Sequence, residues 1–249
     1  MRAPRQMTLT PDLVAQVHRV LEDPGPDPDW TYHSDSDYDA VVQTLLASRP
    51  GGQDTWLFAY GSLIWKPEVE HVEVRQGTAR GWHRSFCFRI VLFRGTREKP
   101  GLMMSLDRGG QCRGVLHRLA PENLEGQLSK LVRREMMVKP PNNLARWITV
   151  QTEQGPLGAV AFVMNRRSRF YVGKLALEEV ADTLARACGH WGSCAEYLCN
   201  TVAHLEEHGI HDRGLWRLQE LVAARINQMG RCGSTDKLDR AVNLPSEKS

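Results

Sequence analysis

The sequence predicts an α+β fold in which strands come first and helices follow. Short runs rich in β-branched and aromatic residues, separated by glycine, proline and acidic residues, fill most of residues 56–164. From Leu177 onward, apolar residues recur at helical spacing. Because strands and helices occupy separate parts of the chain, the pattern is typical of an α+β domain and not of repeated βαβ units.

The N-terminal residues 1–53 are expected to form a helical extension. Thr10 is a suitable cap for a helix to about Leu21, since a proline and an acidic residue follow it. The proline-rich stretch 23–29 ends that helix, and a second helix is expected over Tyr38–Ala47.

The main domain is expected over residues 54–229. Its predicted strands are residues 56–60, 72–78, 86–93, 102–106, 114–119, 147–152 and 158–164. One helix, Pro121 to about Met136, interrupts them. Two further helices are expected after Leu177, one beginning with a capping box formed by Ser193 and Glu196, and one capped by Asp212 and ending near Ile226. The polar residues 230–249 are expected to be a disordered tail.

Composition and charge exclude several classes of protein. With 41% hydrophobic and 24% charged residues, the chain is neither mostly disordered nor fibrous. A net charge of +3 gives no support for a nucleic-acid or membrane partner. No export signal or membrane-spanning stretch is recognisable, so we expect a cytoplasmic protein whose six cysteines are reduced.

Glu135 is the first candidate for chemistry, because it lies on the apolar face of the helix that begins at Pro121. It follows Leu124 by eleven residues, which places it only about 20° away from that leucine around the helix axis. Partial burial and the nearby helix C-terminus would both raise its pKa, which suits a group that transfers protons near neutral pH. The alternatives are a helix that has frayed by this point, or an ion pair with a buried arginine.

The turn Tyr60-Gly61-Ser62-Leu63 directly follows a buried strand and is a second candidate. A strand that runs into glycine and serine can direct backbone N–H groups at a carboxylate or an oxyanion. The alternative is an ordinary turn.

Two patterns point elsewhere. His204-Leu-Glu-Glu-His208 matches the H-x-x-E-H pattern of some zinc peptidases, but it also fits a polar helix face. Cys87, between two phenylalanines, is expected in the core. No nucleotide-binding glycine motif is present, so we expect no cofactor and no metal.

Several separated motifs together resemble the ChaC-type γ-glutamylcyclotransferase family, over about residues 55–226. They are Phe58-Ala-Tyr-Gly-Ser-Leu-Ile-Trp-Lys-Pro67, Gly81-Trp-His-Arg-Ser-Phe-Cys87, Arg94-Gly-Thr96, Pro100-Gly101, Gly114-Val115, Arg134-Glu135, Cys194-Ala-Glu-Tyr-Leu-Cys-Asn-Thr201 and Gly209-Ile-His-Asp212. Trp82 and Ala59 depart from the usual pattern, where tyrosine and glycine are frequent.

The resemblance implies a small mixed β-barrel with helices around it, and the cleavage of glutathione to 5-oxoproline and cysteinylglycine. It also implies that Glu135 is the proton acceptor. The substrate's γ-glutamyl group is then expected to lie in a loop made of Tyr60, Gly61, Ser62, Leu63, Ile64 and Trp65.

Three more side chains are candidates for substrate contact. Arg84 and Arg94 could meet the negative charge of glutathione, and Tyr197 could donate a hydrogen bond or simply belong to the core. We expect glutathione as the small-molecule partner, and no nucleic acid, membrane or obligate protein partner. The alternatives are a γ-glutamyl dipeptide or γ-glutamyl-amine as substrate, a zinc hydrolase, and a non-catalytic regulator of cation transport.

Overall fold

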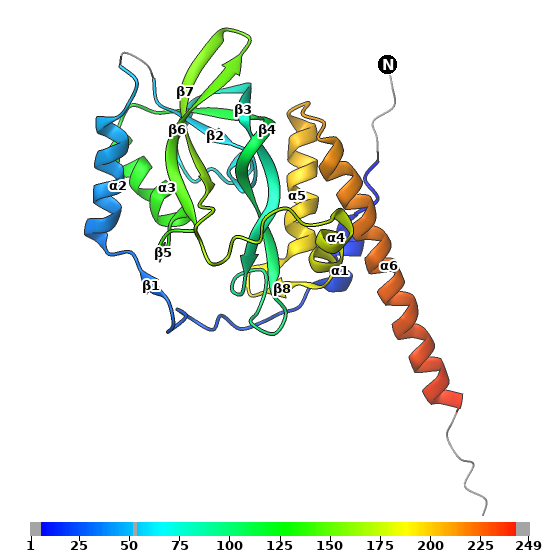
Figure 1. The fold of residues 1–249 in the computed structure, drawn as a ribbon. Coiled ribbons are helices and arrows are strands. Elements are labelled where there is room, and N and C mark those ends of the chain that lie inside the picture. Colours follow the sequence, from blue (N-terminus) through cyan, green and yellow to red (C-terminus); the bar gives the residue numbers. More distant parts are fainter. Residues whose placement is uncertain (1–5, 52–53, 243–249) are drawn as a thin grey trace, which may run out of the picture.

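A closed, five-stranded β-barrel lies at the centre of the computed structural model, which describes residues 6–51 and 54–242 (Figure 1). Its strands, in order around the barrel, are β2 (Trp56–Ala59), β4 (Gly101–Leu119), β3 (His71–Ile90), β6 (Asn143–Thr152) and β7 (Gly155–Met164). β7 runs parallel to β2 and closes the barrel, whereas the β2–β4, β3–β4, β3–β6 and β6–β7 pairs are antiparallel. The barrel is therefore mixed, and the predicted α+β class is confirmed.

The sequence prediction was wrong about the two longest strands, which it divided into four. β3 and β4 pair along nearly their whole length, with shifts in register that include one between Arg80 and Trp82. Gly81 at that shift has a φ of +81°, and Gly109 and Gly110 on β4 have φ values of +107° and +65°. These glycines lie in a bulge, where a positive φ is required, and the ladder continues beyond them.

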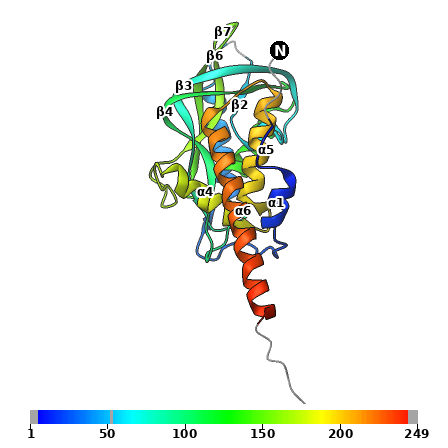
Figure 2. The same ribbon diagram turned by 90° about the vertical axis from the view of Figure 1, so that its right-hand side faces the viewer.

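Helices cover two opposite sides of the barrel. α2 (Asp35–Ala47) and α3 (Leu124–Glu135) pack on one side (Figure 1). The other side is covered by α1 (Pro11–Val17), α4 (Leu177–Arg186), α5 (Cys194–Glu207) and α6 (Arg213–Val242), which Figure 2 shows facing the viewer. Two short pairs lie outside the barrel and were not predicted. They are β1 (Thr31–Tyr32) with β5 (Val138–Lys139), and β8 (Cys188–Gly189) with β9 (Gly192–Ser193).

The predicted helix starts are largely confirmed by the caps. The hydroxyl of Thr10 accepts from the Leu13 N–H, and the hydroxyl of Ser193 accepts from the Glu196 N–H at 3.0 Å. Asp212 accepts from the Leu215 N–H at 3.1 Å. Only half of the predicted capping box at Ser193 is formed, because the Glu196 carboxylate pairs with an arginine described below.

The helix ends differ more from the prediction. α1 stops at Val17 instead of Leu21, because His18 has the extended backbone of a C-cap. α2 begins earlier than Tyr38, at a capping box between Ser34 and Asp37. α6 continues past Ile226 to Val242 and projects from the body of the molecule (Figure 1). Part of the segment predicted as a disordered tail is thus helical, and residues 243–249 lie outside the described residues.

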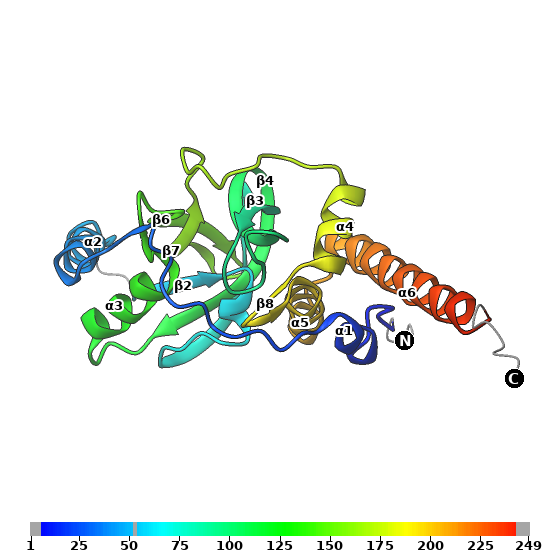
Figure 3. The same ribbon diagram turned by 90° about the horizontal axis from the view of Figure 1, so that it is seen from below.

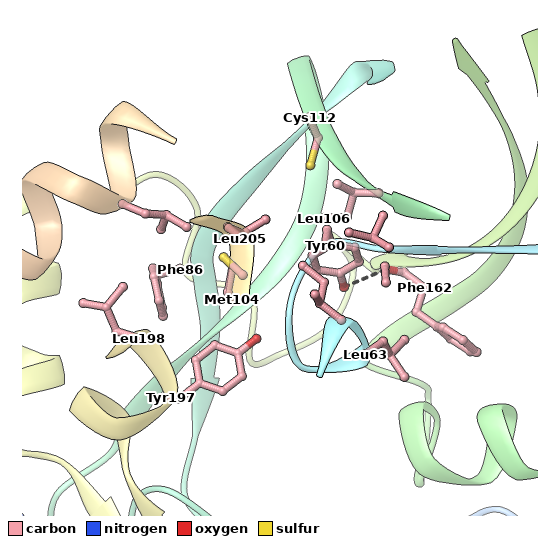
Figure 4. Packing of buried hydrophobic residues seen from close by; sticks show 14 of the residues in the cluster. Tyr60, Leu63, Phe86, Met104, Leu106, Cys112, Phe162, Tyr197, Leu198 and Leu205 are labelled. Atoms are coloured by element: carbon pink, nitrogen blue, oxygen red, sulfur yellow. Dashed lines mark hydrogen bonds between the residues drawn. The ribbon is translucent and has the colours of Figure 1, made fainter. Parts of the chain in front are cut away.

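The hydrophobic core is continuous from the barrel into α5. Figure 4 shows Phe86 and Met104 of the barrel beside Leu198 and Tyr197 of α5. The ring of Phe86 meets that of Tyr197 edge-on, with centroids 6.3 Å apart. Among the described helices, none is long and apolar enough to cross a membrane.

Candidate active site

The loop after β2 is fixed by hydrogen bonds at several points. The strand ends at Ala59, and after Tyr60 and Gly61 the chain makes one turn of 3₁₀ helix, η1 (Ser62–Ile64). The Ile64 N–H donates to the Gly61 carbonyl at 2.9 Å. The hydroxyl of Tyr60 donates to the Phe162 carbonyl of β7 at 2.8 Å, drawn as a dashed line in Figure 4. The loop is therefore held against the barrel wall, which suits a site that must keep its geometry.

Gly61 lies against the hydroxyl of Tyr197. A Cβ atom at Gly61 would lie only 2.6 Å from Tyr197 Oη and 3.3 Å from Met104 Cε. In Figure 4 the Tyr197 oxygen points from α5 toward the loop that carries Tyr60 and Leu63. The absence of a side chain at Gly61 thus allows α5 and the loop to approach closely.

Arg84 lies behind this loop. Its Nε donates to the Tyr60 carbonyl at 2.7 Å, and its Nη1 lies 3.2 Å from the Asp212 carboxylate. Only 5% of its side chain is exposed, and it is not part of the cavity wall described below. The expectation that Arg84 meets the substrate's charge therefore differs from the structure, in which the guanidinium is committed to the protein.

Glu135 is the last residue of α3, and its side chain is only 17% exposed. Leu128, Leu131 and Val132 on the same helix are buried, as the predicted stripe requires. Burial raises the pKa of Glu135 above its ordinary value. The guanidinium of Arg134, with Nε 3.3 Å from Oε1, opposes this rise in pKa, and the negative charge of Glu68 adds to it.

Glu135 and the loop share one cavity of about 560 Å³. Eight of the predicted site residues line it, namely Tyr60, Gly61, Ser62, Leu63, Trp65, Arg94, Glu135 and Tyr197. Ile64 does not line it, and its side chain is buried in the core. The structure thus brings together a carboxylate with a raised pKa and the turn that was predicted to bind a negatively charged group, although the two are far apart in the sequence.

Two tyrosines in this cavity keep their protons. Burial raises the pKa of both Tyr60 and Tyr197, and the nearby charge of Glu135 raises it further. Both phenols are therefore neutral at physiological pH and can act as hydrogen-bond donors.

Arg94 supplies a positive charge at the cavity wall, but that charge is already paired. Its Nη1 donates to the Glu196 carboxylate at 2.6 Å and to the Ser193 carbonyl at 2.8 Å. The guanidinium lies 5.8 Å from the centroid of the Tyr197 ring. Arg94 therefore joins the start of α5 to the cavity and places Tyr197.

Arg134 and Glu68 belong to the site, although sequence reasoning assigned them no role. Arg134 Nη2 donates to the Ser62 hydroxyl at 3.1 Å, and Nη1 lies 3.3 Å from Glu68. Arg134 thus links the end of α3 to the loop and also touches Glu135. Its position next to Glu135 is the one sequence signal that could have identified it.

The zinc hypothesis finds no support in the described residues. No group of three or more His, Cys, Asp or Glu side chains within residues 6–51 and 54–242 could hold a metal. His204 stacks on Trp65 with centroids 5.2 Å apart, and its Nδ1 lies 2.7 Å from the Asn200 carbonyl. Cys87 is buried and free, as expected, and burial raises the pKa of its thiol to about 11.

Comparison with known proteins identifies similar sequences and folds. The family model described as "ChaC-like protein" matches residues 55–225. A glutathione-specific gamma-glutamylcyclotransferase of Escherichia coli (strain K12) is 37% identical over 177 residues, which cover 71% of this chain and 76% of that protein. Glutathione-specific gamma-glutamylcyclotransferase 1 of Mus musculus is 34% identical over 150 residues, covering 59% of this chain and 67% of that protein.

A solved structure resembles the fold at lower sequence identity. The crystal structure of a yeast γ-glutamyl cyclotransferase specific to glutathione matches with a TM-score of 0.63 at 19% identity. The match covers 70% of this chain and 97% of the yeast chain. It shows that the barrel with its surrounding helices is a known arrangement.

Proposed function

The chain belongs to the ChaC-like protein family, and from this premise we propose that it is a lyase, a γ-glutamylcyclotransferase that degrades glutathione to 5-oxoproline and cysteinylglycine. The observation that carries the proposal is the shared cavity, in which Glu135 with its raised pKa meets the loop from Tyr60 to Trp65. The relatives named above, which are glutathione-specific enzymes, support the choice of substrate.

The reaction needs no nucleophile from the protein. The α-amino nitrogen of the γ-glutamyl group attacks its own γ-carbonyl carbon, a C–N bond closes the five-membered ring, and the amide C–N bond to cysteinylglycine breaks. The protein must fold the substrate so that nitrogen and carbon are in contact, which removes most of the entropic barrier. The firmly held loop is suited to that task.

Glu135 is proposed as the group that moves the proton. Its carboxylate accepts a proton from the α-ammonium group, which frees the attacking lone pair. The resulting carboxylic acid then returns the proton to the departing amine nitrogen. A carboxyl group with a pKa raised toward neutrality can do both, since its two protonation states are closer in free energy.

The loop and the neutral hydroxyl of Tyr197 are proposed to stabilise negative charge. Backbone N–H groups of Gly61, Ser62 and Leu63 would hold either the substrate carboxylate or the oxyanion on the γ-carbonyl. Tyr197 lines the same cavity and would donate its hydroxyl, whereas the Tyr60 hydroxyl donates to the Phe162 carbonyl, so Tyr60 would hold the loop in place. Trp65 would pack against the substrate's carbon chain, and Ile64 and Arg84 would support the loop from behind.

The remaining parts of the proposal follow the sequence expectations. Residues 54–229 would be the catalytic domain, with residues 1–53 as an extension and the chain beyond residue 229 as a tail. The enzyme would act in the cytoplasm on glutathione, with no cofactor, no metal and no obligate protein partner. It would bind neither nucleic acid nor membrane.

Incubating the purified protein with glutathione tests the reaction. Mass spectrometry should detect 5-oxoproline and cysteinylglycine in equal amounts. Intact glutathione would contradict the proposal, and a panel of γ-glutamyl dipeptides and γ-glutamyl-amines would then identify a different substrate. If the whole panel also stayed intact, the protein would be a non-catalytic regulator.

A further inference from the structure

Residues 23–33 cross the lower end of the barrel on the way from α1 to α2. In Figure 3, seen from below, this blue segment passes in front of the barrel. We call it the N-terminal strap. It precedes residues 55–225, the part of the chain that matches the family model. Nevertheless, Trp30 of the strap lines the same cavity as Glu135.

The first half of the strap is fastened through Asp27. Its side chain is only 3% exposed, and Arg97 Nη2 lies 2.6 Å from each of its carboxylate oxygens. The Asp27 N–H donates to the Tyr32 hydroxyl at 2.6 Å, and the Asp29 N–H donates to Asp27 Oδ1 at 3.0 Å. We call the Asp27–Arg97 ion pair, together with these hydrogen bonds, the Asp27 clasp. Because a buried carboxylate that loses its cation is strongly destabilising, the Asp27 clasp holds the strap in place.

The second half of the strap is fastened beside the catalytic carboxylate. β1 in the strap pairs antiparallel with β5, with Tyr32 opposite Val138. The His33 N–H donates to the Met137 carbonyl at 3.1 Å, and His33 Nδ1 lies 2.6 Å from the Met136 carbonyl. Met136 directly follows Glu135, so the strap is attached to the segment that leaves the end of α3.

Trp30 lies between these two attachments and is half-buried. Its ring meets that of Phe170 edge-on, with centroids 5.6 Å apart. Phe170 in turn meets Phe88 at 6.4 Å. All three rings line the cavity, and we call them the aromatic wall. Trp30 comes from the strap, Phe88 from the end of β3, and Phe170 from the segment that follows β7.

The size of the cavity leaves room for more than the γ-glutamyl group. A volume of about 560 Å³ is in the range that holds a whole small ligand. The loop from Tyr60 to Trp65 and Glu135 account for the γ-glutamyl end, so the rest of the substrate must lie along another part of the same cavity. Aromatic rings make favourable contacts with sulfur and with methylene groups, both of which a cysteinyl side chain provides.

We propose that the aromatic wall binds the departing cysteinylglycine part of the substrate, and that Trp30 makes the N-terminal strap a determinant of specificity. This proposal rests on the proposed function. It assigns a role in substrate selection to a segment that lies outside the family match.

Steady-state kinetics of Trp30→Ala with glutathione test the role of the ring. Loss of one aromatic contact should raise KM about tenfold, while kcat stays within about threefold of the wild type. Inhibition by cysteinylglycine should weaken to a similar extent, whereas inhibition by 5-oxoproline should not change. Trp30→Phe, which retains an aromatic face, should stay within about threefold of the wild-type KM.

Two further variants separate binding from general destabilisation. Arg97→Met keeps Trp30 but opens the clasp on Asp27, so KM should rise here as well. Trp147→Phe is the matched control. Trp147 Nε1 bonds to the Leu45 carbonyl of α2, outside the cavity, so this variant should lose stability without a change in KM.

An unchanged KM in Trp30→Ala would overturn the proposal, whatever the KM of Arg97→Met. Equal weakening of inhibition by both products would also overturn it, because the effect would then not be confined to the departing part. Failure of the proposed function looks different, since the wild-type protein itself would then leave glutathione intact.

Discussion

Gly61→Ala should destabilise the protein through a single steric contact. The new Cβ would lie 2.6 Å from Tyr197 Oη, about an ångström closer than a normal contact, and 3.3 Å from Met104 Cε. The methionine end is flexible and can give way. The tyrosine cannot move easily, because its ring is 3% exposed and packed in the core. Overpacking of this kind costs about 1–3 kcal/mol.

A double-mutant cycle isolates that contact. In a Tyr197→Phe background the hydroxyl is absent, and the nearest remaining ring atom of residue 197 is the Cζ, at 3.8 Å, an ordinary contact. Gly61→Ala should therefore cost about 1–3 kcal/mol more in the wild type than in the Tyr197→Phe background, as measured by urea unfolding. Any backbone cost common to both backgrounds cancels. Equal destabilisation in the two backgrounds would refute the close approach of α5 to the loop.

Three other perturbations follow from the site. Arg84→Met should lower the free energy of unfolding by about 3 kcal/mol in a urea titration, because it removes the cation beside Asp212 and the donor to the Tyr60 carbonyl. Arg217→Met, at an exposed ion pair, should cost less than about 0.5 kcal/mol in the same titration. The acid limb of the pH profile of kcat/KM should lie above the ordinary glutamate pKa of about 4.3. Arg134→Met should move this limb to still higher pH, because Arg134 stabilises the charged form of Glu135. A limb that moves to lower pH in this variant would contradict the assignment. A chelator should leave turnover of glutathione unchanged, whereas loss of activity that zinc restores would favour the His204 and His208 hypothesis.

The raised pKa of Glu135 also affects the free energy of unfolding. A carboxyl group whose pKa is higher in the folded state binds its proton more tightly there, so it opposes folding once the pH rises through that pKa. The cost is absent below the unfolded pKa, where both states are protonated. Glu135 is thus a residue whose placement weakens the fold at neutral pH, as expected of a group retained for chemistry.

The parts of the site that could be predicted from the sequence are those encoded locally. The helical stripe of Leu128, Leu131 and Val132 is sufficient to place Glu135 on the inner face, because helix periodicity is a short-range property. The turn at Gly61 is likewise marked by its own residues. Its close neighbour Tyr197 is not, since that contact depends on how α5 packs against the barrel.

The remaining features depend on contacts between distant segments. Arg84 resembled a substrate-binding cation, but its partners Tyr60 and Asp212 are separated from it by many residues. Trp30 carries no local signal at all, because its place in the cavity follows from the Asp27 clasp and from β1, a strand too short for a sequence pattern. Local patterns predict elements, whereas these contacts depend on the tertiary packing.

The wild-type protein and Glu135→Gln, compared side by side with glutathione, test the central claim most directly. The amide has nearly the shape of the carboxyl group but cannot accept the proton, so formation of 5-oxoproline should fall by several orders of magnitude while glutathione still binds and the fold is retained. Near-normal turnover in Glu135→Gln would contradict the role of Glu135 as the proton acceptor.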